Sequence, residues 1–182
     1  GRAGNLDMLT RMAADGSFRL HVTQPVMKDG ERVSSSRIRK LVVSGDVGSA
    51  ARLLGRFFSV CGTVVRGAGR GRTLGFPTAN LALDGETLPA DGVYACRADT
   101  EGKVVLASVH IGPIPTFGLA GRVVEAHLLD FNQELLGKRL QIHFVRRIRE
   151  IRTFLHPEDL VRQISEDIAA TRELDLSITG RL

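Results

Sequence analysis

The chain has 182 residues, which is enough for one compact domain or for one domain with an appendage. Hydrophobic residues make up 43% and charged residues 25%, a composition that excludes wholesale disorder, and no apolar run is long enough to span a membrane. The formal net charge of +5 suits an anionic partner, either a nucleotide or a nucleic acid. Two cysteines without CxxC spacing, Cys61 and Cys96, favour free thiols, so we expect a cytoplasmic protein.

The chain begins with an α/β pattern. Asn5 is placed to cap a helix that ends near Gly16. Phe18, Leu20 and Val22 then alternate with polar residues, which predicts a short strand.

Two more helices follow this strand in the prediction. Ser34–Ser36 and Asp46 supply the oxygen caps that begin them, and a glycine ends each. Helix, strand, helix and helix are too few elements to cover both faces of a sheet. We therefore expect residues 1–55 to be the remnant of an α/β domain, distinct from a second domain over residues 56–182.

From Phe57 onward the pattern changes to short runs of Val, Ile and Leu between clusters of Gly, Pro and Asp. Five or six such strands without intervening helices predict an antiparallel sheet that closes toward a barrel. Pro157 then opens a last helix, whose expected buried stripe is Leu160, Ile164 and Ile168. The five strand candidates are residues 59–65, 92–98, 104–111, 123–131 and 140–145.

Residues 67–75 form a loop with four glycines and two arginines. Glycine lets backbone N–H groups approach phosphate oxygens and arginine supplies charge-assisted hydrogen bonds, so the loop is a candidate phosphate cradle. It has neither the dinucleotide-binding spacing nor the Gly-Lys-Ser/Thr of a P-loop. The same composition also suits a flexible hairpin turn.

The next segment, Gly-Phe-Pro-Thr-Ala-Asn at residues 75–80, places a hydroxyl and an amide two residues apart. In extended backbone Thr78 and Asn80 point the same way. Two neutral oxygens aimed at one point can complete the shell of a divalent cation that nucleotide phosphates carry. The alternative is a turn in which both side chains bond their own backbone.

Glu125 lies within the strand candidate over residues 123–131 and shares a largely apolar face with His127 and three hydrophobic residues. A carboxylate there is costly unless it is paired or useful, which makes Glu125 a candidate general base. An ion pair between Glu125 and an arginine at the barrel rim remains the alternative. A metal held by Glu125 and His127 is disfavoured because no third ligand lies nearby in the sequence.

Five stretches in this order are specific enough to carry a family resemblance: residues 62–67, 70–80, 88–94, 115–117 and 124–131. Residues 57–174 thereby resemble the riboflavin kinase domain of the bacterial bifunctional riboflavin kinase/FAD synthetases. The most specific signal is Gly-Phe-Pro-Thr-Ala-Asn followed later by Glu-x-His-Leu-Leu-Asp-Phe. Through Gly1–Asn5 and Val33–Arg39, the N-terminal residues resemble the end of the FMN adenylyltransferase module of the same proteins.

The resemblance implies a mainly β fold: a six-stranded antiparallel Greek-key barrel with a C-terminal helix, preceded by a partial α/β nucleotidyltransferase segment. It implies an ATP-dependent riboflavin kinase that uses Mg²⁺ or another divalent cation and converts riboflavin and ATP to FMN and ADP. Its partners would be these small molecules, with no nucleic acid and no membrane. Adenylyl transfer to FMN is not expected of this chain, because its five histidines lack the His-x-x-His or His-x-Gly-His spacing.

The resemblance also assigns site residues. Glu125 would accept the proton of the ribityl 5′-hydroxyl, and Thr78 and Asn80 would hold the cation. Arg149 and Phe154 would help to hold the flavin; the alternative for this pair is a basic surface segment with a phenylalanine packed under the last helix. The residues that would bind the nucleotide are Gly67, Gly69, Arg70, Gly71, Arg72, Gly75, Pro77, Thr78 and Asn80.

Two departures from the family pattern leave alternatives open. The family usually has Asn-Ile-Gly-Thr/Asn-Arg-Pro-Thr-Phe where residues 110–117 are His-Ile-Gly-Pro-Ile-Pro-Thr-Phe, and Leu-Tyr-Gly where residues 135–137 are Leu-Leu-Gly. These changes remove polar groups near the substrate region, so a kinase-fold module without activity is one alternative. A basic β-barrel that binds RNA is the other, although aromatic residues for base stacking are scarce.

Overall fold

The chain forms two compact units. The computed structural model describes residues 5–14, 16, 18–28, 30–83, 85, 87–113 and 121–174, so the motif at 115–117 and the first four residues lie outside the described residues. The first unit ends at Val33 and the second begins at Ser34. The boundary predicted from the sequence, between residues 55 and 56, lies further along the chain.

The first unit contains helix α1 (Leu6–Ala14) and a two-residue antiparallel pairing of β1 (Met27–Lys28) with β2 (Glu31–Arg32). The predicted cap is confirmed, because the Met8 N–H donates to the side-chain oxygen of Asn5 over 2.9 Å. The predicted strand at residues 18–22 is wrong. Its backbone has no ladder partner in the described part of the chain, and alternation alone cannot supply a neighbouring strand.

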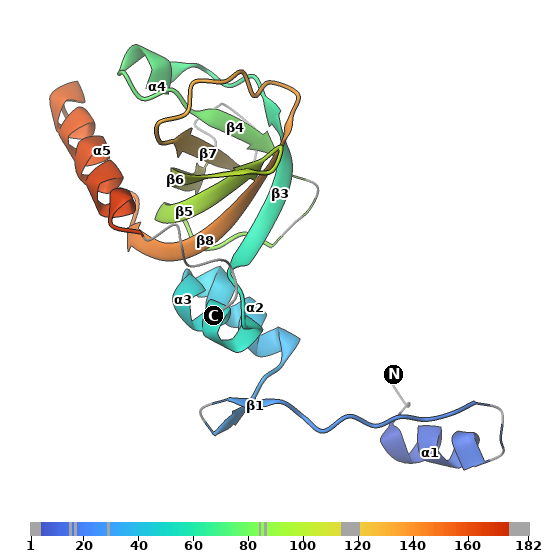
Figure 1. Ribbon diagram of the computed structural model, residues 1–182. Coiled ribbons are helices and arrows are strands. Elements are labelled where there is room, and N and C mark those ends of the chain that lie inside the picture. The colour runs from blue at the N-terminus through green and yellow to red at the C-terminus, as the bar shows by residue number, and fades with distance from the viewer. Residues whose placement is uncertain are drawn as a thin grey trace. The chain divides into compact units, whose positions relative to one another are not determined.

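The second unit opens with helices α2 (Ser35–Ser44) and α3 (Val47–Leu54), both as predicted. The Ser34 hydroxyl accepts from the Arg37 N–H over 3.3 Å, and Asp46 Oδ1 accepts from the Ser49 N–H over 2.9 Å. Gly45 and Gly55 end the helices in the left-handed conformation. Buried residues of α3 pack against the barrel that follows (Figure 1).

Six antiparallel strands close into a barrel in the order β3-β4-β7-β6-β5-β8. This confirms the predicted six-stranded antiparallel barrel with a C-terminal helix. The sequence did not single out β4, because four residues are too few for a periodic signal. The strands are β3 (Phe58–Val65), β4 (Ala79–Ala82), β5 (Gly92–Thr100), β6 (Lys103–Pro113), β7 (Arg122–Leu128) and β8 (Arg139–Arg149).

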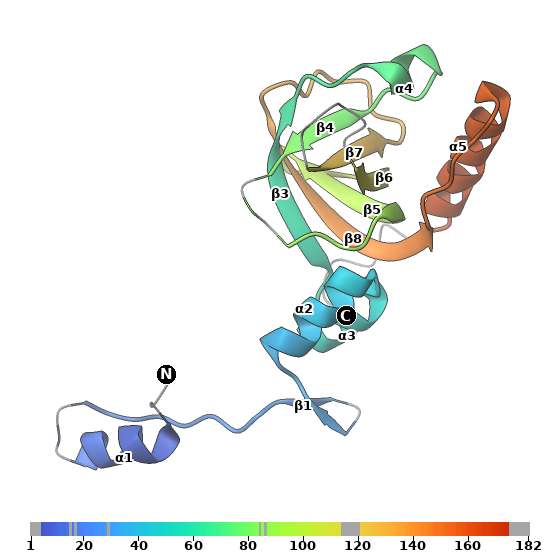
Figure 2. The same cartoon turned by 180° about the vertical axis from the view of Figure 1, so that it is seen from behind.

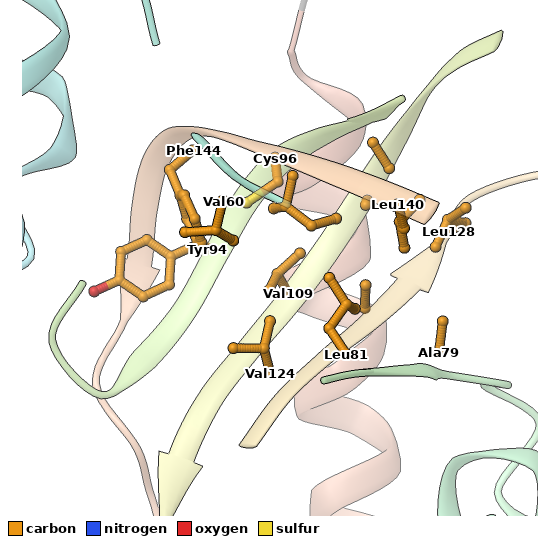
Figure 3. Close-up of a cluster of buried hydrophobic side chains, with 14 of the residues drawn as sticks. Val60, Ala79, Leu81, Tyr94, Cys96, Val109, Val124, Leu128, Leu140 and Phe144 are labelled. Atoms are coloured by element: carbon orange, nitrogen blue, oxygen red, sulfur yellow. The ribbon is translucent and has the colours of Figure 1, made fainter. Parts of the chain in front are cut away.

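Alternate residues of these strands fill the inside of the barrel, as Figure 3 shows. The ring of Tyr94 meets that of Phe144 edge-on, with 5.4 Å between centroids, and its hydroxyl donates to the Ala90 carbonyl over 2.7 Å. Burial raises the pKa of Tyr94. Because the interior is packed with side chains, a ligand has to bind at the end or on the outside of the barrel.

Helix α5 (Pro157–Arg172) lies on the outside of the barrel, against β5 and β6 (Figures 1 and 2). Its start at Pro157 is confirmed, but the expected apolar stripe is only half-buried. The residues that are buried on this helix are Asp167 and Thr171. The physical reason is that the helix meets Arg149 of β8, so its contact face carries Asp167 as the partner of that charge.

Candidate active site

The glycine loop contains a single helical turn, α4 (Arg70–Thr73), and folds back onto the segment that follows it. A Cβ on Gly67 would lie 2.1 Å from Nδ2 of Asn80, and a Cβ on Gly71 would lie 2.3 Å from the Phe76 carbonyl oxygen and 3.2 Å from Oγ1 of Thr78. Only glycine permits these approaches. The loop backbone is thereby placed against both predicted cation ligands.

The segment from Phe76 to Asn80 is anchored on β7. Nδ1 of His127 hydrogen-bonds to the Pro77 carbonyl oxygen over 2.8 Å, and the rings of Phe76 and His127 meet edge-on with centroids 5.9 Å apart. His127 therefore holds the Pro-Thr-Ala-Asn segment in place. No cluster of three or more metal-binding His, Cys, Asp or Glu side chains occurs among the described residues, so a metal held by Glu125 and His127 gains no support.

Thr78 and Asn80 do not form the self-bonded turn that was their alternative. In the described part of the chain, neither side chain hydrogen-bonds to its own backbone, and Asn80 lies in β4, opposite Val65 of β3. Their oxygens meet the places that a Cβ of Gly67 or Gly71 would fill. Two neutral oxygens beside the backbone of the glycine loop suit a hydrated divalent cation, which prefers oxygen ligands and keeps several waters.

A cavity of about 870 Å³ lies at this end of the barrel. Of the predicted nucleotide-binding residues it includes Gly67, Gly69, Arg72, Pro77, Thr78 and Asn80, whereas Arg70, Gly71 and Gly75 do not line it. Its other wall is residues 131–136, none of which was predicted as a site residue from the sequence. The polar run Asn-Gln-Glu at 132–134, directly after the specific Leu-Leu-Asp-Phe motif, was the available signal.

Glu125 is placed beside this cavity but not in its lining. It lies on β7, directly opposite Asn80 of β4 and His110 of β6. Because Val124 and Ala126 point into the barrel, Glu125 points outward, and its side chain is 36% exposed. The strand ends at Leu128, so the expected apolar face does not extend to Leu129 or Phe131.

The ionisable side chain within 4.0 Å of Glu125 in the described residues is a histidine, and not the arginine of the rim alternative. Among the described residues, the charged side chain within 4.0 Å of Glu125 is His110, whose Nδ1 is 4.0 Å from Oε2. Burial lowers the pKa of His110, and the Glu125 carboxylate opposes that shift. Within the described residues, the Glu125 carboxylate therefore pairs with no lysine or arginine, and it stays partly exposed to solvent.

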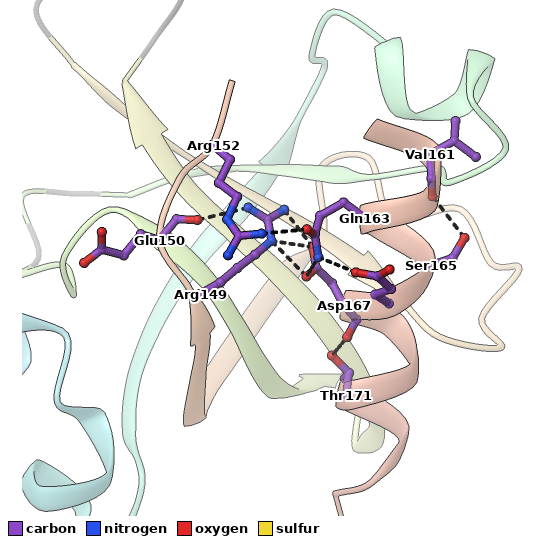
Figure 4. A network of polar contacts seen from close by, with 9 residues as sticks. Arg149, Glu150, Arg152, Val161, Gln163, Ser165, Asp167 and Thr171 are labelled. Atoms are coloured by element: carbon purple, nitrogen blue, oxygen red, sulfur yellow. Dashed lines mark hydrogen bonds and ion pairs between the residues drawn. The ribbon is translucent and has the colours of Figure 1, made fainter. Parts of the chain in front are cut away.

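Arg149, the first predicted flavin residue, ends β8 and faces helix α5 (Figure 4). Phe154, the second, lies in the segment between β8 and α5. The guanidinium carbon of Arg149 is 5.9 Å from the centroid of the Phe154 ring. The same guanidinium donates to both Asp167 oxygens over 2.8 to 3.1 Å, and the two side chains are only 12% and 4% exposed. Neither predicted residue lines the cavity at the glycine loop. Nothing in the sequence alone singles out Asp167.

A family model described as Flavokinase, riboflavin kinase, matches residues 54–174, which include the loop, Asn80, Glu125 and Arg149. The chain belongs to the riboflavin kinase family. Its alternatives as an RNA-binding barrel or an inactive module are not favoured by this membership.

Similar proteins of this family are longer than the chain. It is 37% identical over 174 residues to the bifunctional riboflavin kinase/FMN adenylyltransferase of Pseudomonas fluorescens, covering 95% of this chain and 56% of that protein. It is 38% identical over 157 residues to the protein of the same description from Bacillus subtilis, covering 84% and 50%. The chain thus spans about half the length of the curated relatives it matches.

A solved structure gives the same fold. The chain is similar to a crystal structure described as a macrolide-efflux protein from Streptococcus pneumoniae, with a TM-score of 0.78 and 36% sequence identity over 83% of this chain and 50% of that chain. In the described residues, no helix has both the length and the apolar composition for crossing a bilayer.

Proposed function

We propose that this riboflavin kinase family member transfers the γ-phosphate of ATP to the ribityl 5′-hydroxyl of riboflavin and releases FMN and ADP. The observation that carries the proposal is the position of Asn80. It lines the cavity formed by the glycine loop, and it lies directly opposite Glu125 in the sheet. A nucleotide held in the cavity would therefore present its terminal phosphate close to the only carboxylate of that strand.

The glycine loop would bind the phosphates of ATP. Backbone N–H groups exposed by glycine, together with the guanidinium of Arg72 at the cavity wall, are suited to phosphate oxygens. Arg70, on the same helical turn, would add positive charge from outside the cavity. Phosphoryl transfer depends mostly on positioning and charge neutralisation, so this small set of groups is sufficient.

Thr78 and Asn80 would hold the divalent cation, Mg²⁺ or another, through their side-chain oxygens, because hard cations prefer oxygen ligands. The cation would neutralise charge on the phosphates. His127, which bonds the Pro77 carbonyl, would keep the two ligands at a fixed distance from β7.

Glu125 would act as the general base. As the riboflavin oxygen forms its bond to the γ-phosphorus, the bond from that phosphorus to the β-γ bridging oxygen breaks and ADP leaves. The hydroxyl proton passes to the Glu125 carboxylate. Riboflavin would lie between this carboxylate and the α5 side, where Phe154 offers an aromatic face and Arg149 holds the connection between β8 and α5.

The experiment that tests this function mixes the purified chain with riboflavin, ATP and Mg²⁺ and follows FMN by chromatography. We expect FMN to form only when all three are present. Absence of FMN under conditions where the chain is folded would contradict the proposal. Tight binding of oligonucleotides that weakens steeply with salt would instead favour the RNA-binding alternative.

We also propose an origin for residues 1–55, the partners of the chain and its location. Residues 1–55 would be the C-terminal remnant of an adenylyltransferase module, so no FAD should form from FMN and ATP. ATP and riboflavin would be the partners, with no nucleic acid and no membrane involved. A cytoplasmic location suits the two free thiols, of which Cys96 is fully buried with its pKa raised by burial.

A further inference from the structure

His110 lies beside the proposed base on the outer face of the barrel. The residue is directly opposite Glu125 across β6 and β7, and its Nδ1 is 4.0 Å from Oε2 of that carboxylate. Asn80 flanks Glu125 on the other side, in β4. The three side chains thus form a row across adjacent strands, and His110 is the member to which the proposed function assigns no role.

The imidazole is fixed in orientation by the glycine two residues further along the strand. A Cβ on Gly112 would lie 2.9 Å from Cε1 and 3.0 Å from Nε2 of His110. The ring therefore packs directly against the Gly112 backbone with its Cε1–Nε2 edge, and the Nδ1 edge is the one that approaches Glu125. This arrangement is set by the fold, before any ligand binds.

Nδ1 of His110 is buried and has no hydrogen-bond partner within the described part of the chain. A buried polar atom without a partner is costly, so an unmade bond of this kind requires an explanation. At 4.0 Å the Glu125 oxygen is just beyond hydrogen-bond range. Hydrogen bonds in active sites are often long without substrate and shorten in the reactive complex.

Burial and the charges around His110 determine whether its imidazole is protonated. Glu125 on β7, Arg149 on β8 and Asp91 before β5 are the ionisable groups that act on it. Burial lowers its pKa most, Arg149 lowers it further, and the two carboxylates oppose the shift. The imidazole is therefore neutral near pH 7 and carries one proton, which it can donate to Glu125 without cancelling the negative charge of the base.

Building on the proposed function, we propose that His110 is a positioning residue for Glu125. With its proton on Nδ1, the imidazole donates a hydrogen bond to one carboxylate oxygen when ATP and riboflavin are bound, and the other oxygen then faces the 5′-hydroxyl. The hydroxyl proton still moves to Glu125, and His110 neither gains nor loses a proton. This histidine is a feature of this chain, because the family pattern that the sequence resembles has asparagine at the corresponding position.

The first test compares His110→Phe, which keeps the ring and removes the donor, with His110→Asn, whose amide nitrogen reaches a position close to that of Nδ1. We expect His110→Phe to lower kcat roughly 10- to 100-fold and to leave the KM values for riboflavin and ATP nearly unchanged. His110→Asn should restore most of kcat. The matched control is His143→Phe, another half-buried histidine of the barrel whose pKa burial also lowers, and it should keep normal kcat.

The second test combines His110→Phe with Glu125→Gln. If His110 acts through Glu125, the double variant turns over no more slowly than Glu125→Gln alone. The positioning role would be overturned if His110→Phe lowered kcat by the same factor in the Glu125→Gln background as in the wild type. Normal kcat in the single variant His110→Phe would overturn it as well. A rise in KM without a loss of kcat would overturn it too, because it would mean substrate contact instead.

The third test does not need turnover. Nitrogen NMR of the full chain with riboflavin, ADP and Mg²⁺ should find the His110 proton on Nδ1, and a proton on Nε2 would contradict the proposal. Wild-type chain that makes no FMN overturns the proposed function and is recognised in the same assay. Wild-type chain that makes FMN while His110→Phe keeps normal kcat overturns only the role of His110.

Discussion

At the glycine-loop end of the site, Thr78 and Asn80 meet loop backbone beside a cavity, and Glu125 has His110 as its ionisable neighbour, 4.0 Å away, among the residues that the structure describes. On the α5 side, Arg149 and Asp167 are almost fully buried and make three hydrogen bonds to each other. The polar groups of the first region are available to a ligand, and those of the second are used by the fold. Mutations in the first region should therefore lower the catalytic rate, whereas mutations in the second should lower the stability of the fold.

The largest effect on rate should come from Glu125→Gln, which keeps the size of the side chain and removes its ability to accept a proton. We expect kcat to fall roughly 10²- to 10⁴-fold, or about 3–5 kcal/mol of barrier, while riboflavin and nucleotide still bind. The melting temperature should hardly change, because the side chain is 36% exposed and pairs with no lysine or arginine in the part of the chain that the structure describes. Measurement of kcat, flavin affinity and melting temperature on this one variant checks the prediction. Near-normal kcat would remove Glu125 from the mechanism.

The opposite signature is expected for Asp167→Asn. This change leaves the Arg149 guanidinium buried without a counter-charge, which should lower the free energy of unfolding by roughly 3–5 kcal/mol. Denaturant unfolding measures it. The control is Glu173→Gln, whose ion pair with Arg146 is mostly exposed and should contribute about 0–1 kcal/mol. Equal stability losses in the two variants would mean that the α5 side is not held by its buried pair.

Gly67→Ala should affect nucleotide binding and leave the fold intact. The new Cβ would lie 2.1–2.7 Å from the Asn80 amide atoms, so the end of that side chain has to move. We expect the KM for ATP with Mg²⁺ to rise about 10-fold, equivalent to about 1.4 kcal/mol, with little change in riboflavin affinity. Gly48→Ala on α3 is the control, because its Cβ would meet only Asp46 Oδ1 at 3.9 Å. An unchanged KM for ATP would contradict the role of Asn80.

The smallest effect concerns a helix cap remote from both regions. Asp46→Ala removes the acceptor for the Ser49 N–H and should cost about 0.5–2 kcal/mol of stability. The same hydrogen bond lowers the pKa of Asp46 below its usual value of 3.8. The folded state therefore binds its proton less tightly than the unfolded state, and the contribution is present above pH 3.8 and is lost as the pH falls through the lowered pKa.

Urea unfolding of wild type, Asp46→Ala and Asp46→Asn at pH 6 and at pH 3 checks both parts of this prediction. Asparagine keeps the acceptor without the charge, so Asp46→Asn should be close to wild type at pH 6 and lose less stability than wild type on acidification. A wild-type protein as resistant to acid as Asp46→Asn would show that the cap carries no charge-dependent stability.

What the sequence predicted correctly was mostly local. Ser34 and Asp46 cap their helices through contacts three residues away, so neighbouring residues determine the result. Pro157 begins α5 for the same reason. Long apolar strands were also recognisable, since their composition differs from that of the turns around them. The strand prediction at Phe18–Val22 was wrong because a strand needs a partner, and alternation does not reveal whether one exists.

The site was harder to predict because it depends on pairing between distant segments. Asn80 meets Glu125 only through the register of β4 with β7, and β4 itself is too short to recognise. Asp167 is an acidic residue on a helix like several others until Arg149 of β8 is placed beside it. Residues 131–136 become a cavity wall only once the barrel closes.

Tyr94, described above as part of the barrel core, also has a spectroscopic consequence. The chain has one tyrosine and no tryptophan, so its fluorescence, when excited at wavelengths that phenylalanine does not absorb, comes from a single ring in contact with Phe144. Unfolding followed by that emission reports on the barrel interior alone, with no introduced label. Opening of α1 or α5 would leave the tyrosine signal unchanged and would have to be followed by another probe. Unfolding of the barrel and local opening of these helices can therefore be told apart in one sample.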